Sequence, residues 1–178
     1  THLADHVAGA KLIVEGSHFW WKGDLADAIA AFVGQLQAEA AELDRVLATV
    51  LFTDIVNSTS TAAKLGDRGW RELLERHHSA VRGLLARYRG TEVNTAGDGF
   101  FATFDGPARA VRCALAIAEA VRPLGLEIRA GVHTGEVETI DQEVGGLAVV
   151  IGARIGALAG SSEILASSTV RDLTAGSG

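Results

Sequence analysis

Two aspartates stand where the sequence predicts two neighbouring strand ends. Asp54 closes the apolar run VLATVLFTD, and Asp98 lies between two glycines in TEVNTAGDGFFATF. A continuous apolar run is typical of a strand buried on both faces, and a Gly-X turn between two β-type runs indicates a hairpin. Mg²⁺ is commonly held by one or two carboxylates together with substrate phosphates. Either aspartate alone is explained more simply by capping or turn chemistry, but the pair predicts a metal site.

The residues after Asp54 are suited to hold phosphate groups. They run into a hydroxyl-rich helix start, where backbone N–H groups have no acceptor within the helix and attract anions. The predicted phosphate contacts are Ile55, Val56, Asn57, Ser58 and Thr59.

Alternating β and α patterns predict the elements that position these residues. We expect a strand ending at Asp54, a short helix stopped at Gly66, a long amphipathic helix stopped by Gly90 at its C′ position, and the hairpin 91–104. Next come a helix starting at Pro107, a strand over 126–137, a helix over 147–159, a strand over 163–167 and a short helix after it. This order predicts an α+β fold, a ferredoxin-like βαββαβ core with an extension.

Composition excludes several classes of function. The chain has 178 residues, 48% of them hydrophobic, with a net charge of −6 and no basic run, which argues against a nucleic-acid partner. Its one cysteine, Cys113, is expected to pack as a small apolar group. The apolar run VGGLAVVIGARIGALAG contains Arg154, and its Gly152, Gly156 and Gly160 indicate a helix packed closely on a sheet. We therefore expect no membrane insertion and a cytoplasmic location.

Four ordered motifs resemble a known family. VLFTDIVNSTSTAAKLGD, NTAGDGFFATF, IRAGVHTGEVE and VGGLAVVIGARIGALA are similar to the class III adenylyl/guanylyl cyclase catalytic domain of the bacterial type, over about residues 46–175. The resemblance implies a ferredoxin-like core and conversion of ATP (or, less readily, GTP) to a 3′,5′-cyclic nucleotide and pyrophosphate. It also implies two Mg²⁺ or Mn²⁺ ions per site, and active sites shared across a head-to-tail homodimer.

The resemblance also implies roles for individual residues. Asp54 and Asp98 match the two metal-binding aspartates, and Arg154 matches the arginine that stabilises charge on the transferring phosphoryl group. The substrate contacts implied by position are Phe52, Ile55, Val56, Asn57, Ser58, Thr59 and Gly97.

Three positions depart from the family pattern. Asn94 stands where a purine-selecting lysine is usual, and Glu143 where its aspartate partner is usual. Asn94 can still offer an amide to a base edge, and Glu143 can still accept from an exocyclic amine. The longer carboxylate and the lost cation reshape this pocket, and ATP is expected ahead of GTP. Val150 falls at the usual transition-state asparagine and cannot donate a hydrogen bond. Losing one such donor commonly costs about 10²–10³ in rate, so we expect weak activity.

The first 36 residues differ from the rest. Residues 1–36 resemble the C-terminal end of an α/β-hydrolase, with a strand over 11–16, a helix that Asp24 caps, and His18 at the position of the triad histidine. No nucleophile elbow accompanies them, so His18 is not expected to act as a base here. We expect 37–45 to be a linker and 46–178 a cyclase domain that stops short of the family's usual last hairpin.

Two other functions remain open from the sequence. A degenerate cyclase domain that binds nucleotide or only dimerises would also explain Val150 and Asn94. A related palm-type nucleotidyl transferase is disfavoured, because no G-G-D-E-F-like turn is present. The remaining histidines are interpreted as structural: His77 and His78 on a helix surface or interface, and His133 on the polar face of a strand.

Overall fold

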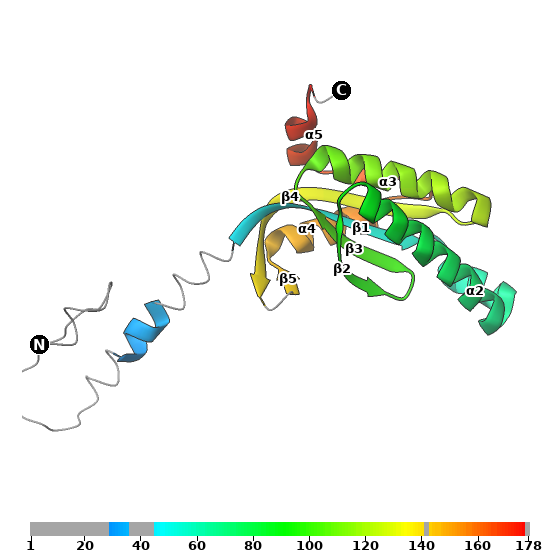
Figure 1. Ribbon diagram of the computed structural model, residues 1–178, viewed down its shortest axis with the longest axis horizontal. Helices are drawn as coiled ribbons and strands as arrows, with labels where there is room; N and C mark the ends of the chain where they lie inside the picture. Colours follow the sequence, from blue (N-terminus) through cyan, green and yellow to red (C-terminus); the bar gives the residue numbers. More distant parts are fainter. Residues whose placement is uncertain (1–28, 36–44, 141–142, 177–178) are drawn as a thin grey trace, which may run out of the picture. The chain divides into compact units, whose positions relative to one another are not determined.

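The computed structural model describes residues 29–35, 45–140 and 143–176 (Figure 1). The chain divides into two compact units, Thr1–Ala40 and Ala41–Gly178. In the first unit residues 29–35 are helical, within the helix that the sequence predicted. The predicted strand over 11–16, His18 and the Asp24 cap lie outside the described residues.

The second unit is the α+β domain that the sequence predicted. Its described elements are β1 (Arg45–Ile55), α2 (Ser58–Arg87), β2 (Thr91–Ala96), β3 (Gly99–Phe104), α3 (Pro107–Val121), the 3₁₀ turn η1 (Arg122–Leu124), β4 (Ile128–Ile140), β5 (Glu143–Gly145), α4 (Leu147–Leu158), β6 (Ile164–Ala166) and α5 (Ser168–Thr174). The sheet order is β2-β3-β1-β4-β5, antiparallel throughout, and β6 pairs with β4 in parallel. The first four strands and two helices form the expected βαββαβ core.

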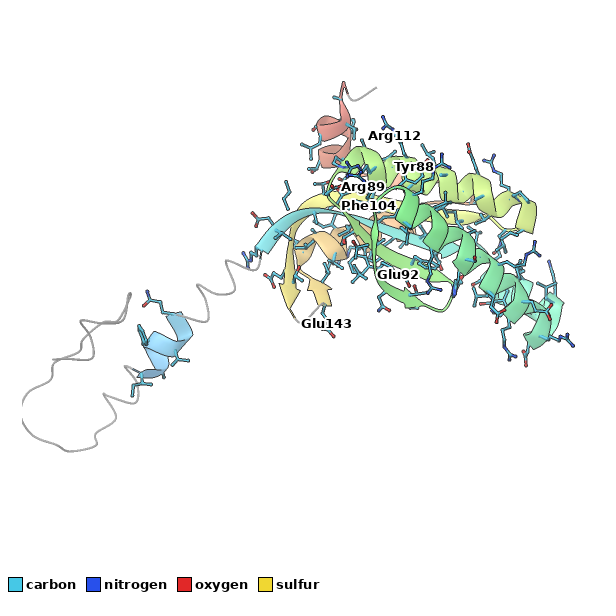
Figure 2. All side chains as sticks on the ribbon, in the orientation of Figure 1. Tyr88, Arg89, Glu92, Phe104, Arg112 and Glu143 are labelled. Atoms are coloured by element: carbon cyan, nitrogen blue, oxygen red, sulfur yellow. The ribbon has the colours of Figure 1, made fainter. Side chains whose placement is uncertain are left out.

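Three local features differ from the expectations. The short strand β5 was missed, because three residues carry too little pattern to recognise. The two predicted helices after Asp54 form one element, α2, with a kink at Gly66, whose φ is 69°. At the end of α2 the left-handed position is taken by Arg89 (φ 58°) rather than by Gly90. Gly90 is needed for another reason: a Cβ there would lie 2.5 Å from Cζ of Phe104, whose ring lies near Tyr88 and Arg89 (Figure 2).

The sheet separates two apolar layers. Figure 1 shows α2 and α3 along one side of the long strands β1 and β4, and α4 on the other. Alternate residues of β1 pack into the two layers. Leu51 belongs to the large core under α2 and α3, and Val50 belongs to the smaller core with Ala148 of α4. The large core also contains Cys113, which is fully buried as predicted, and burial raises the pKa of its thiol to about 12.

Glycines let α4 approach the sheet directly. A Cβ on Gly131 of β4 would lie 2.2 Å from the backbone nitrogen of Gly156, and one on Gly152 would lie 2.5 Å from Cγ2 of Val50. The predicted close packing of this helix is therefore confirmed for Gly152 and Gly156, but not for Gly160, which is exposed. The backbone of α4 lies against β4 with no side chain between them.

Two histidines are buried: His77, which was expected on a helix surface or interface, and His133, which was expected on the polar face of a strand. His77 of α2 has no exposed surface, and neither ring nitrogen has a hydrogen-bond partner. Burial first, and then the charge of neighbouring His78, lower the pKa of His77 to about 4. His133 of β4 is 8% exposed, and its Nδ1 lies 2.9 Å from the hydroxyl of Ser167. Burial lowers its pKa as well.

His77 should make the domain less stable in acid. The unfolded chain binds a proton at this histidine near pH 6.5, whereas the folded protein binds it only near pH 4. Between these values the unfolded state holds more protons, so stability falls as the pH falls, by at most about 3 kcal/mol. Urea unfolding at pH 7 and pH 4.5 measures this loss. The loss should shrink in His77→Phe, and an equal loss in both proteins would contradict the assignment.

Candidate active site

The β2–β3 hairpin places Asp98 beside the end of β1. Ala96 pairs with Gly99, so Gly97 and Asp98 are the two turn residues. Of these two only Gly97 has a positive φ, 62°, which is the pattern of a type II′ turn and agrees with the predicted Gly-X hairpin. Across the sheet Phe100 pairs with Thr53. A Cβ on Gly99 would lie 3.1 Å from the carbonyl oxygen of Thr53 and 3.8 Å from Oδ1 of Asp54.

Asp54 forms an ion pair that the sequence did not predict. It lies opposite Arg129 in the pairing of β1 with β4. Both Nε (3.0 Å) and Nη2 (2.5 Å) of Arg129 donate to Oδ2 of Asp54. The side chain of Asp54 is 39% exposed and that of Arg129 is 38% exposed. Since both bonds use Oδ2, they leave Oδ1, the oxygen near Gly99, to accept from another group.

Asp98 carries an unsatisfied buried oxygen. Its Oδ2 is buried, and it has no hydrogen-bond partner among the described residues. A buried carboxylate oxygen without a donor or a cation destabilises a fold. Such an atom is therefore the kind of group that a bound cation would satisfy.

The two carboxylates fit a hard divalent cation. Both present oxygen atoms, which Mg²⁺ and Mn²⁺ prefer. No group of three or more histidines, cysteines, aspartates and glutamates suited to a metal was found in the described part of the chain. An ion held by Asp54 and Asp98 would therefore complete its coordination with water or with substrate oxygens, as Mg²⁺ does in nucleotide enzymes.

A cavity of about 330 Å³ opens next to Asp54, on the side of the sheet that α4 covers. Its aromatic wall is a stacked pair, Phe52 and Phe101, with ring centroids 4.5 Å apart. The lining residues are Phe52, Thr53, Asp54, Asn94, Ala96, Gly99, Phe100, Phe101, Arg129, Ala153, Gly156 and Ala157. The structure thus brings three of the predicted site residues, Phe52, Asp54 and Asn94, to one cavity.

The remaining predicted residues lie elsewhere. Arg154 and Val150 are exposed on α4, and neither lines the cavity. Glu143 is exposed on β5, and Figure 2 shows it well apart from Glu92 of the β2–β3 hairpin. Within one chain the predicted site is therefore divided between the cavity beside Asp54 and the outer surface of α4 and β5.

The predicted phosphate segment needs one correction. The backbone N–H of Val56 donates to the carbonyl of Glu127 at 2.9 Å, so it is not free to bind phosphate. Ile55 is buried. Asn57 takes a left-handed conformation (φ 57°) before α2 without a side-chain capping bond, so the N–H groups of the first helical turn remain available.

Arg129 is the site residue that the sequence analysis missed. The alternating pattern of LEIRAGVHTGEV placed it correctly in a strand. The residue opposite it depends on the register between β1 and β4, which joins positions 75 residues apart. The signal that could have identified it is the positive charge of Arg129 between the apolar residues of a predicted strand.

Comparison with known proteins identifies the relatives of the chain. The family model described as adenylate and guanylate cyclase catalytic domain matches residues 39–159. An adenylate cyclase of Lachancea kluyveri is 30% identical over an alignment that covers 67% of this chain and 8% of that protein. The crystal structure of the guanylyl cyclase Cya2 is 25% identical, with a TM-score of 0.67, over 73% of this chain and 79% of that one. An adenylate/guanylate cyclase/hydrolase from Silicibacter pomeroyi is 27% identical, with a TM-score of 0.63, over 74% of this chain and 80% of that one.

The chain belongs to the adenylate and guanylate cyclase catalytic-domain family. These relatives include both adenylyl and guanylyl cyclases. In the described residues no helix is long and apolar enough to cross a membrane.

Proposed function

We propose that the chain is a nucleotidyl cyclase that converts ATP to 3′,5′-cyclic AMP and pyrophosphate. The observation that carries this proposal is the unsatisfied Oδ2 of Asp98, on a turn adjoining Asp54 and its cavity, in a chain of this family. In the reaction the ribose 3′-oxygen attacks the α-phosphorus and pyrophosphate leaves.

The residues of the cavity and of the adjoining turn have separate roles. Asp54 and Asp98 would hold Mg²⁺ or Mn²⁺, which would stabilise charge on the attacking and leaving oxygens. Arg129 neutralises Asp54 when no nucleotide is present, and its guanidinium is placed to meet a phosphate oxygen when one arrives. Asn94, on the cavity wall, offers an amide to the edge of the base. This amide can both donate and accept, so it can pair with the base of ATP or of GTP.

The division of the site supports a homodimer. Glu143, Val150 and Arg154 are exposed and do not line the chain's own cavity. Helix α4, which carries Val150 and Arg154, also exposes Leu147 and Leu158, 73% and 78% accessible. A second copy packed against this apolar surface would bring Arg154 to the partner's cavity, where a cation stabilises the transferring phosphoryl group. In this arrangement each active site uses both chains.

The same proposal assigns a role to each segment of the chain. Residues 46–178 form the cyclase domain, 37–45 a linker, and 1–36 a remnant of an α/β-hydrolase, in a protein placed in the cytoplasm.

Val150 should limit the rate. It is 47% exposed on α4, one turn before Arg154, and presents only methyl groups where a donor would stabilise transition-state charge. Val150→Asn should raise kcat by about 10-fold or more, with less change in KM, because the new bond forms mainly in the transition state. Steady-state kinetics measures this change, and Val150→Leu is the control for size. An unchanged kcat would show that position 150 does not face the reacting groups.

A second candidate function is a nucleotide-binding or dimerisation module without turnover. Valine at position 150, which cannot donate a hydrogen bond, favours this second function. It predicts Mn²⁺-dependent binding of ATP without a cyclic product.

Product analysis separates the two functions. The chain is incubated with Mn²⁺ and either ATP or GTP, and the nucleotides are identified by mass spectrometry. Cyclic AMP that is lost on adding EDTA supports the cyclase. Nucleotide binding without product at micromolar protein supports the binding module, and a cyclic GTP product above cyclic AMP would overturn the preference for ATP.

A further inference from the structure

Helix α2 holds the hairpin that carries Asp98 at two places. At the tip, Nε2 of His78 lies 3.0 Å from the carbonyl oxygen of Gly97. At the base, Arg82 donates two hydrogen bonds to Glu92, at 2.8 and 2.9 Å. The hydrogen bond from Arg82 is the main cause that lowers the pKa of Glu92 to about 2. The base of the hairpin is therefore tied to α2 by a charge-assisted pair.

The ring of Phe100 fills the space between these two contacts. Phe100 is 3% exposed and follows Asp98 by two residues. The ring of His78 meets it edge-on with centroids 5.1 Å apart, and the ring of His77 lies 5.8 Å away. Cζ of Arg82 lies over the same ring at 5.6 Å. Phe100 is thus fixed by packing, so the remaining freedom of the turn lies in the residues just before it.

That freedom is the orientation of the peptide between Gly97 and Asp98. Rotating the central peptide of a two-residue turn converts type II′ to type I′ and gives the second residue a positive φ. Glycine accepts either form, and aspartate is one of the few other residues that tolerate a positive φ. The turn sequence therefore does not select one orientation by itself.

The hydrogen bond from His78 selects one orientation of the Gly97–Asp98 peptide. A backbone carbonyl oxygen only accepts, so Nε2 of His78 carries the proton and donates it to Gly97. Flipping the peptide would turn this oxygen away and break the bond. The orientation of this peptide also sets the direction in which the Asp98 carboxylate points.

We propose that His78 is a positioning residue that holds the Gly97–Asp98 peptide in the orientation that presents Asp98 to a divalent cation. This inference rests on the proposed role of Asp98 in binding metal. His78 touches neither metal nor nucleotide and acts only through the turn. Its removal should weaken metal binding without unfolding the domain.

Two replacements of His78 test this role. His78→Phe keeps an aromatic ring against Phe100 but removes the donor, and His78→Gln restores an N–H group at similar reach. Mn²⁺ binding is measured from the electron paramagnetic resonance signal of free Mn²⁺, with 3′-deoxy-ATP present as a nucleotide that cannot cyclise. His78→Phe should raise the half-saturating Mn²⁺ concentration about 3- to 10-fold, the effect of one hydrogen bond. His78→Gln should stay within about 2-fold of the original protein.

Two further measurements exclude a general loss of structure. Arg68→Ala, which breaks the exposed pair with Glu72 on the same helix, should leave Mn²⁺ binding unchanged. In ¹⁵N spectra of His78→Phe the amide signals of Gly97 and Asp98 should split or broaden, while those of β4 stay in place. If His78→Phe folds poorly, His78→Leu replaces it in the same comparison with His78→Gln.

The outcomes separate this inference from the proposed function. If Asp98→Asn weakens Mn²⁺ binding and His78→Phe does not, His78 is not a positioning residue although the metal site stands. Equal weakening in His78→Phe and His78→Gln also overturns the inference, since the donor would then be irrelevant. If Asp98→Asn binds Mn²⁺ like the original protein, the metal site itself is wrong and the inference fails with it.

Discussion

Asp98→Asn should abolish cyclic nucleotide formation while leaving the folded protein as stable as before, or more stable. The substitution keeps the shape of the side chain but removes the charge that would bind the cation, so activity should fall more than about 100-fold, as expected when a metal ligand is lost. The buried Oδ2 has no partner. A neutral amide costs less to bury there than a charged carboxylate, by about 1 kcal/mol. Product formation with Mn²⁺ and urea unfolding measure the two effects.

Two other aspartates complete this experiment. Asp54→Ala should be equally inactive, but it leaves Arg129 without its acceptor, so a small loss of stability is expected. Asp105, which pairs with Arg109 on the surface, is the matched control, and Asp105→Asn should keep its activity. Activity in Asp98→Asn within 10-fold of the original protein would remove Asp98 from the site.

Gly131→Ala should be the most destabilising small substitution in the domain, by about 3 kcal/mol or more. The added Cβ would lie 2.2 Å from the backbone nitrogen and 2.6 Å from Cα of Gly156. Backbone atoms cannot rotate away as a side chain can, so α4 would have to move off β4. The loss of stability is measured by urea unfolding. Because α4 also carries Arg154, any protein that still folds should be less active.

Gly83→Ala is the matched control for this substitution. Gly83 lies on the exposed side of α2, and a Cβ there would meet nothing within 4 Å. Alanine in a helix interior is favoured over glycine by about 0.5–1 kcal/mol, so Gly83→Ala should stabilise the protein. If Gly131→Ala lost less than about 1 kcal/mol, the close packing of α4 on β4 would not hold in solution.

Local patterns in the sequence predicted much of the fold. Pro107 begins α3 as expected, because its fixed φ suits the first helical turn and its missing N–H has no partner there anyway. Gly97 and Asp98 form the predicted two-residue turn. The apolar run before Asp54 is a central strand with β3 and β4 on either side. For the helix start and the turn, the deciding interaction lies within a few residues of the one that predicts it, and the strand was recognised from its own apolar run.

Features that depend on distant pairing were not predictable in the same way. The partner of Asp54 is set by the register of β1 on β4, and a shift by two residues would have put another side chain opposite it. The bond from Val56 to the carbonyl of Glu127 has the same origin. His77 looked like a surface residue by type, but its place on the apolar side of α2, four residues before Val81, decided its burial.

The single cysteine of the chain gives the domain its own reporter of opening. Cys113 has no accessible surface, and its thiol stays protonated far above neutral pH. A disulfide reagent reacts with thiolates, so it can modify this side chain only in molecules whose interior has transiently opened. The rate of modification therefore follows opening of the large core, so each variant described above can be checked for an intact interior without adding a probe.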